Sequence, residues 1–167
     1  MLRISKLTDY ATVILAMLAE EPVRVQTATT LSERTHIAGP TVSKLLKQLQ
    51  RAGLVSSTRG LHGGYRLARP ASEISAASIL DALEGPLALT DCSVGHGQCG
   101  IEETCRVGRA WQRLNLAIRR SLQEVTLAQL AGLDPVQPHL PVVEREIKFA
   151  ARGGPPGMTR GGPQRMR

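Results

Sequence analysis

The sequence is poor in aromatic residues, and this scarcity limits the kinds of nucleic acid that it can bind. Its 167 residues include one Trp, two Tyr and one Phe. Proteins that bind RNA or single strands stack the bases on aromatic side chains, so the composition disfavours that class. The sequence also lacks an apolar run of transmembrane length and a signal-peptide cleavage site near its start. We therefore expect a cytoplasmic protein with no membrane partner.

The residue sets on which most enzymes depend are also missing. The sequence shows no paired carboxylates, no Ser-His-Asp set and no nucleotide-binding loop. Its Gly63-Gly64 pair lacks the Gly-Lys-Ser/Thr ending of a phosphate-binding loop. We predict a protein that is not an enzyme.

Acidic residues are absent between Glu33 and Glu73, whereas seven Lys and Arg residues fall in that stretch. Residues 1–70 carry ten Lys and Arg against four Asp and Glu, and residues 71–133 carry five against seven. A basic first half joined to a slightly acidic second part indicates a nucleic-acid surface connected to a sensing or dimerising part.

Apolar residues at helical spacing predict three helices, at 5–20, 27–34 and 41–52. The apolar face of the first includes Tyr10 and Met17, and the buried stripe of the third is Val42, Leu45, Leu46 and Leu49. Gly53 is expected to end the third helix. A tight turn at 36–40 joins the last two, which together read as a helix-turn-helix. In that motif the second helix lies in the major groove of DNA. Its predicted outward-facing contacts are Thr41, Ser43, Lys44, Lys47 and Arg51. The alternative is an ordinary helix hairpin with a solvated outer face.

A glycine-rich hairpin is predicted directly after this helix, with strands at 54–58 and 65–68. Such a hairpin is the wing of a winged helix. Its tip needs small residues so that the backbone can approach the sugar-phosphate chain, and one cation favours that approach. Arg59, Gly63 and Gly64 fill these roles and complete the predicted DNA-binding set.

Two further helices are predicted, at 75–83 and from 104 to about 123. The second carries an apolar stripe of Val107, Trp111, Leu114, Ile118, Leu122 and Val125. It has no partner helix of similar length, which favours packing against its own copy in a homodimer. Packing on its own domain alone is the other interpretation. The predicted fold is mainly α with a small β-hairpin wing: a winged helix-turn-helix plus a long C-terminal dimerisation helix. We divide the chain into three parts. Residues 1–70 form a DNA-binding region, and residues 71–133 add, in the same compact domain, the dimerisation helix and a cysteine-containing loop that is expected to bind a metal cluster. Residues 134–167 form a disordered, basic, Pro- and Gly-rich tail.

All three cysteines, Cys92, Cys99 and Cys105, fall in one short polar segment. Glycines between them allow the backbone to fold so that the thiolates converge. Three soft ligands on such a segment suit a zinc ion or an iron–sulfur cluster. The odd number argues against a simple disulfide framework. The bland alternative is a set of unpaired surface thiols.

Several segments together resemble the bacterial winged-helix family that includes the iron–sulfur regulators IscR and NsrR. They are residues 6–11 (KLTDYA), 53–60 (GLVSSTRG), 63–65 (GGY) and 125–127 (VTL), with the three cysteines. The opening and the cysteine spacing look most like the subgroup that regulates the SUF operon for iron–sulfur cluster assembly. The resemblance covers residues 1–133. It implies a homodimeric regulator that binds a palindromic operator in double-stranded DNA under the control of a [2Fe–2S] or [4Fe–4S] cluster.

The resemblance also implies a fourth, non-cysteine ligand for the cluster. The IscR pattern has a His three residues after the third cysteine, where this chain has Gly108. The NsrR pattern has an Asp near the start of the first helix, contributed by the other subunit, and Asp9 occupies the matching place. The helix dipole also favours an acid there. His96 is the alternative, completing a site that zinc also accepts. A nitric-oxide-sensing repressor and a winged helix with a structural zinc remain as alternative functions.

Overall fold

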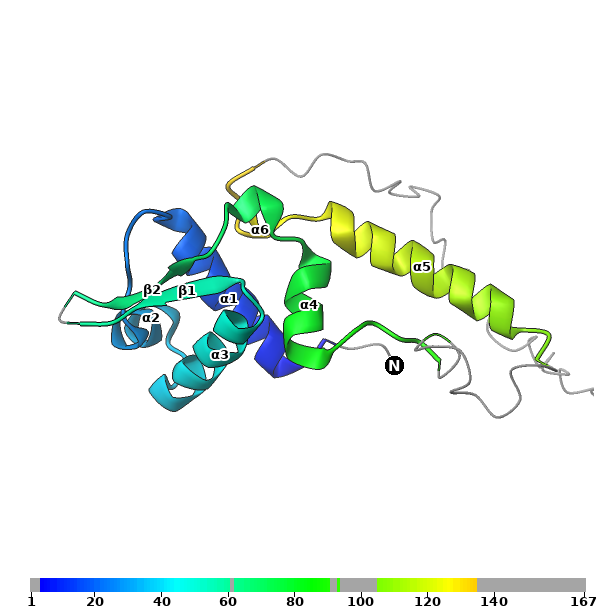
Figure 1. Cartoon of the computed structure of the whole chain (residues 1–167), viewed down its shortest axis with the longest axis horizontal. Helices are drawn as coiled ribbons and strands as arrows, with labels where there is room; N and C mark the ends of the chain where they lie inside the picture. The colour runs from blue at the N-terminus through cyan, green and yellow to red at the C-terminus, as the bar shows by residue number, and fades with distance from the viewer. Residues whose placement is uncertain (1–3, 61, 91–92, 94–104, 135–167) are drawn as a thin grey trace, which may run out of the picture. The chain divides into compact units, whose positions relative to one another are not determined.

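The described part of the chain, residues 4–60, 62–90, 93 and 105–134, is mainly helical with one small hairpin in this computed structural model (Figure 1). Its elements in chain order are α1 (Lys6–Glu20), α2 (Ala28–Thr35), α3 (Gly39–Arg51), β1 (Val55–Thr58), β2 (Gly64–Leu67), η1 (Ala71–Glu73), α4 (Ala76–Glu84), α5 (Gly108–Glu124) and α6 (Leu127–Leu130). Two helices joined by a tight turn and followed by a hairpin form a winged helix-turn-helix. The predicted fold class is confirmed.

Hydroxyl side chains begin four of the helices, because an oxygen at this position satisfies a backbone N–H that the helix leaves without a partner. Ser5, Thr27, Ser75 and Thr126 each accept a hydrogen bond from the N–H three residues on, at 3.1–3.2 Å. Thr126 also forms a capping box, in which Gln129 Oε1 accepts from the Thr126 N–H at 3.0 Å. These helix starts are therefore encoded locally.

Helix α3 supplies the centre of the core, and its predicted stripe is fully buried. The stripe consists of Val42, Leu45, Leu46 and Leu49. It belongs to one cluster with Ile14, Leu15 and Leu18 of α1, Leu31 of α2 and Leu127 of α6. Tyr10 and Met17, predicted for the apolar face of α1, are only half-buried. Because one face of α3 is committed to the core, its opposite face points to solvent.

The hairpin pairs β1 with β2 in antiparallel register, from Val55 opposite Leu67 to Thr58 opposite Gly64. Its strands begin one residue after and one residue before the predicted positions. Gln26, in the connection between α1 and α2, pairs with Tyr65 of β2 through two backbone hydrogen bonds of 2.9 and 2.8 Å. The wing is therefore attached to the helix-turn-helix by a one-residue third strand.

Helix α5 begins at Gly108, four residues after the predicted start of the long helix. It is tied to α4 by Arg119, whose guanidinium forms two hydrogen bonds to the Asp81 carboxylate, at 3.1 and 2.6 Å. Among the described residues, no helix is both long and apolar enough to cross a membrane. Apart from Asp134, the predicted disordered tail lies outside the described residues.

Candidate nucleic-acid interface and metal-ligand residues

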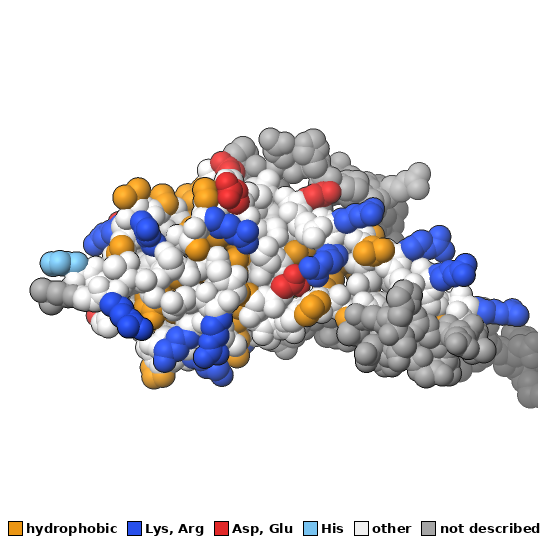
Figure 2. All heavy atoms as spheres, viewed as in Figure 1, with side chains coloured by type: hydrophobic (Ala, Val, Ile, Leu, Met, Phe, Trp, Pro, Cys, Tyr) orange, Lys and Arg blue, Asp and Glu red, His pale blue; other side chains and the backbone are white. Residues whose placement is uncertain are grey.

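The outer face of α3 is basic. Lys44, Lys47 and Arg51 are exposed, and none of them forms an ion pair within the described part of the chain. Thr41 and Ser43, nearer the start of the helix, are half-buried. Figure 2 shows Lys and Arg side chains gathered over α3. Three cations on one exposed helix face, with no ion-pair partner among the described residues, suit contact with a phosphate backbone.

Three predicted DNA-binding residues lie at the turn of the wing. One is an exposed cation, and the other two are glycines that the fold of the hairpin requires. Arg59 is exposed and makes no ion pair with any described residue. A Cβ on Gly63 would lie 2.3 Å from the Thr58 carbonyl oxygen, and one on Gly64 would lie 2.6 Å from the Gln26 carbonyl oxygen. Both distances are too short for any side chain, so the fold of the hairpin itself requires these glycines.

The recognition helix and the wing are joined directly. Gln50 Nε2, in the last turn of α3, donates a 2.8 Å hydrogen bond to Ser57 Oγ of β1. The backbone N–H of Leu54 also donates to the Leu49 carbonyl at 2.9 Å. These bonds hold the base of the wing beside the C-terminal end of α3.

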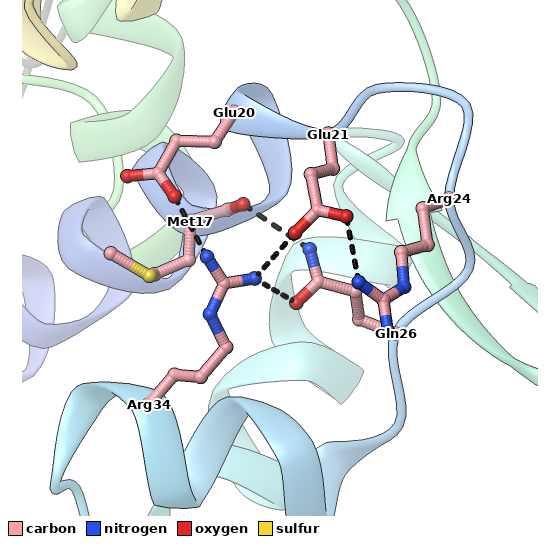
Figure 3. A network of polar contacts seen from close by, with 6 residues as sticks. All are labelled: Met17, Glu20, Glu21, Arg24, Gln26 and Arg34. Carbon is pink, nitrogen blue, oxygen red and sulfur yellow. Dashed lines mark hydrogen bonds and ion pairs between the residues drawn. The ribbon is translucent and has the colours of Figure 1, made fainter.

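Arg34 belongs to the basic run in sequence, but its charge is used inside the protein. Its guanidinium donates to Glu20 at 2.8 Å, to Glu21 at 3.0 Å and to Gln26 Oε1 at 2.8 Å (Figure 3). Glu21 also pairs with Arg24 at 2.8 Å, and these hydrogen bonds and charges lower the pKa of the Glu21 carboxyl. Arg34 therefore differs from Lys44, for which the structure describes no such partner.

The N-terminus of α1 holds the predicted fourth ligand. Asp9 is exposed in the first turn, and its carboxylate has no hydrogen bond or ion pair within the described residues. The turn itself is tied to the end of α4, because Glu84 Oε1 accepts from Thr8 Oγ1 and from the Ser5 backbone N–H at 3.0 Å. The hydrogen bond from Thr8, then that from Ser5, lowers the pKa of the Glu84 carboxyl.

Of the three cysteines, only Cys105 lies within the described residues. Its thiol is half-buried and free, three residues before α5 begins. Cys92, Cys99 and His96 lie outside the described residues. Within the part of the chain that is described, no three His, Cys, Asp or Glu side chains converge as a metal site.

Sequence reasoning missed Asn115, which is 7% exposed in the middle of α5. Its Nδ2 donates to the Leu87 carbonyl and its Oδ1 accepts from the Leu89 N–H, both at 3.2 Å. One amide thus satisfies two backbone groups of the segment that leads into the cysteines. The available signal was a polar residue set inside the apolar stripe of this helix.

The rest of that stripe is divided between burial and exposure. Ile118 and Leu122 are half-buried, whereas Val107, Trp111 and Leu114 are 59%, 43% and 45% exposed. The stripe is therefore wider than the surface that the described part of the chain covers.

Comparison with known proteins identifies the group to which this arrangement belongs. Residues 4–132 match the Rrf2 family, described as an iron-dependent transcriptional regulator. The chain belongs to the Rrf2 family. Protein aau3 of Rhizobium meliloti is 30% identical over 135 residues, which cover 80% of this chain and 88% of that protein. A Haemophilus influenzae protein described as an HTH-type transcriptional regulator is 37% identical over 102 residues, 61% of this chain and 67% of its own.

Solved structures of the same fold include two regulators. CymR, the global cysteine regulator of B. subtilis, is 27% identical and superposes with a TM-score of 0.63, covering 80% of this chain and 99% of its own. IscR of T. potens is 27% identical with a TM-score of 0.58, covering 81% of this chain and 91% of its own. The Rrf2 chain described here is thus a transcriptional regulator of a DNA-binding family and not an enzyme, as predicted.

The donor set of this Rrf2 chain fits an iron–sulfur cluster by its chemistry. Three thiols within one short segment are soft ligands for iron, and Cys105 is free to bind. The exposed Asp9 carboxylate is a hard oxygen donor with no competing partner among the described residues. If Asp9 and the thiolates bound one cluster, the carboxylate position would be held less strongly than the thiolate positions.

Proposed function

We propose that the protein is a homodimeric regulator that binds a palindromic operator through α3 and the wing, under the control of an iron–sulfur cluster. The observation that carries the DNA contact is the exposed cationic face of α3. Thr41, Ser43 and Lys44, in its first half, would reach base edges in the major groove, since recognition helices read bases with their N-terminal residues. Lys47 and Arg51, in its second half, would contact phosphates.

The wing would add a contact to the sugar-phosphate backbone through Arg59. Gly63 and Gly64 contribute to this contact by shaping the turn, since their lack of side chains lets the hairpin fold tightly. A cation at the wing tip neutralises phosphate and releases counterions, so it strengthens binding without specifying sequence.

The homodimer would form through α5. Its exposed side carries Val107, Ala110, Leu114 and Ala117, spaced alternately by three and four residues. This is the spacing of a helix seam that packs against another helix. We expect Leu114→Glu to shift the sedimentation coefficient of the purified chain to that of a monomer. Leu116→Glu is the matched control, because Leu116 is 53% exposed on the opposite side of the same helix.

The cluster, [2Fe–2S] or [4Fe–4S], would be held by Cys92, Cys99 and Cys105, with Asp9 of the first helix as the fourth ligand and His96 as the alternative. When bound, it supplies a group that oxygen, nitric oxide or iron shortage can alter. The chain's own part would be to bind the cluster beside the start of α5, the helix through which the homodimer would form. Regulated genes would be those of SUF-type cluster assembly, or of a nitric-oxide response.

Anaerobic purification tests the cofactor. We expect coloured protein that contains iron and acid-labile sulfide in comparable amounts, and Cys99→Ala protein that is folded and colourless. Asp9→Ala is expected to lose the cluster faster in air with an unchanged far-UV circular dichroism spectrum. Colourless wild-type protein with one tightly bound zinc per chain would instead establish the structural-zinc alternative.

A second candidate function rests on the likeness to CymR, which superposes with a higher TM-score than IscR. In this case the chain would regulate cysteine-related genes, and its thiols would not bind iron. Wild-type protein that binds DNA equally well with and without bound metal, and that never holds iron under anaerobic conditions, would favour this candidate.

A further inference from the structure

Gln26 is a buried polar residue at the point where three elements of the DNA-binding region meet. Its side chain and backbone are 2% exposed, although it lies in a connection between helices. Its backbone N–H and carbonyl pair with those of Tyr65 in β2. Its side-chain Nε2 donates to the Met17 carbonyl of α1 at 3.2 Å, and its Oε1 accepts from Arg34 of α2 at 2.8 Å. Figure 3 shows the two side-chain contacts, with Met17 and Arg34. Together with the backbone pairing to Tyr65, they connect α1, α2 and the wing through one residue.

The backbone of the wing presses closely on this residue. A Cβ on Gly64 would lie 2.6 Å from the carbonyl oxygen and 2.8 Å from the carbonyl carbon of Gln26. Only glycine allows β2 to approach so near. The start of β2, next to the turn of the wing, is therefore held against the Gln26 backbone.

Arg34 fixes the position of Gln26 from the other side. Its guanidinium spans Glu20, Glu21 and Gln26 in one planar fork, and its side chain is 32% exposed. A guanidinium bound at several points is held in orientation as well as in place. Arg34 lies in the last turn of α2, directly before the turn that leads into α3. The Arg34–Gln26 contact therefore also involves α2, the helix that leads through a tight turn into the recognition helix α3.

We propose that Gln26 and Arg34 are positioning residues for DNA binding, which set the inclination of the wing relative to α3 so that both engage one operator together. Neither touches DNA in this arrangement. The proposal rests on the wing contact of Arg59 stated under "Proposed function". It predicts that Arg59 contributes to binding only while the Gln26–Arg34 contact holds.

A double-mutant cycle tests this coupling, because energetic contributions of independent sites add and those of coupled sites do not. The probe is a labelled duplex enriched from a random-sequence library by the full-length chain, titrated at several salt concentrations. In the wild-type background we expect Arg59→Ala to weaken binding several-fold and to reduce the salt slope by about one counterion. In the Gln26→Ala background we expect Arg59→Ala to change neither quantity further.

Arg34→Met provides a second background if Gln26→Ala reduces the folded fraction, since it keeps the Gln26 side chain and its hydrogen bond to the Met17 carbonyl. Arg24→Met is its matched control. It removes one positive charge from the same network, but Arg24 contacts only Glu21 within the described residues. The Arg59 effect should vanish in Arg34→Met and persist in Arg24→Met. A purely structural loss of folded protein would scale every affinity equally and leave the salt slope unchanged.

Two results would overturn the proposal, and they differ. Equal losses on Arg59→Ala in the wild-type, Gln26→Ala and Arg34→Met backgrounds would show that wing and helix are not coupled, while the wing contact itself stands. No loss on Arg59→Ala in wild-type protein would remove the wing contact and the coupling with it.

Discussion

Replacement of Asn115 by Ala tests how firmly α5 holds the segment before the cysteines. The amide of Asn115 donates to the Leu87 carbonyl and accepts from the Leu89 N–H, each at 3.2 Å. Ala fits the helix without strain and removes both partners at once. Leu87 and Leu89 are half-buried, so water can replace the lost bonds only in part.

The size of the effect follows from the two bonds. A typical hydrogen bond contributes about 0.5–1.5 kcal/mol net, and a buried group left without a partner costs about 1–3 kcal/mol. With partial access to water we expect Asn115→Ala to lower the free energy of unfolding by about 1–3 kcal/mol. Asn115→Asp keeps the acceptor for Leu89 but sets a carboxylate against the Leu87 carbonyl, so it should not restore the loss.

Urea unfolding of the full-length chain at one protein concentration measures this change, with Gln123→Ala as the control. Gln123 is exposed on the same helix, and its removal should change stability by no more than about 0.5 kcal/mol. Hydrogen exchange adds a local measure, because the Leu89 amide should exchange faster in Asn115→Ala. The reasoning fails if Asn115→Ala matches Gln123→Ala in stability and leaves the Leu89 amide equally protected.

Three further perturbations have defined outcomes. Gly64→Ala would place a Cβ 2.6 Å from the Gln26 carbonyl oxygen, and calorimetry should show destabilisation of about 1–3 kcal/mol; unchanged stability would mean that the wing yields freely. Arg119→Met removes the two hydrogen bonds to Asp81 and should cost about 1 kcal/mol in urea unfolding, since both side chains are 32% exposed; no loss would show that α4 holds α5 without this pair. Because the folded-state pKa of Glu84 is lowered, its stabilisation is present at neutral pH and is lost as pH falls below about 4.3, the ordinary value for Glu. The stability difference between wild type and Glu84→Gln should therefore shrink as the medium is acidified, and a constant difference would contradict it.

The features that sequence reasoning located well depend on neighbours in the chain. The stripe of α3 follows from helical periodicity, and the starts at Ser5, Thr27 and Ser75 follow from hydroxyl caps. Gly53 ends α3 as predicted, because it adopts a positive φ of 71° that suits glycine. Each of these signals lies within a few residues of the structure that it specifies.

What sequence reasoning did not show concerns contacts within the fold. Arg34 counted in the basic stretch after Glu33, but its charge is used by Glu20 and Glu21 at the end of α1. Gly63 and Gly64 were predicted from an approach to DNA, and close contacts to carbonyl oxygens of the chain give them a second role in the fold of the hairpin. Charge and glycine content show what a surface is able to do, and only the fold shows which groups are already engaged.

The long helix shows the same limit in its start and in its apolar face. Spacing alone allowed a start at 104, whereas α5 begins at Gly108 after Val107, which offers no side-chain cap. Periodicity also identified the apolar stripe of α5 but not the surfaces that cover it. Asn115 and Leu122 lie on the edge turned to the rest of the described chain, and Leu114 lies on the edge left exposed. A helical pattern specifies that a face is apolar and leaves open which surface covers it.

Helix α5 is connected to the cysteine-containing segment on both sides of that segment. Before the cysteines, the chain is bound to α5 by Asn115 through Leu87 and Leu89. After them, Cys105 leads directly into the start of α5 at Gly108. Gly108 and Asn115 are seven residues apart, which is about two helical turns or 10 Å. Both ends of the segment are therefore attached to the same short stretch of one helix.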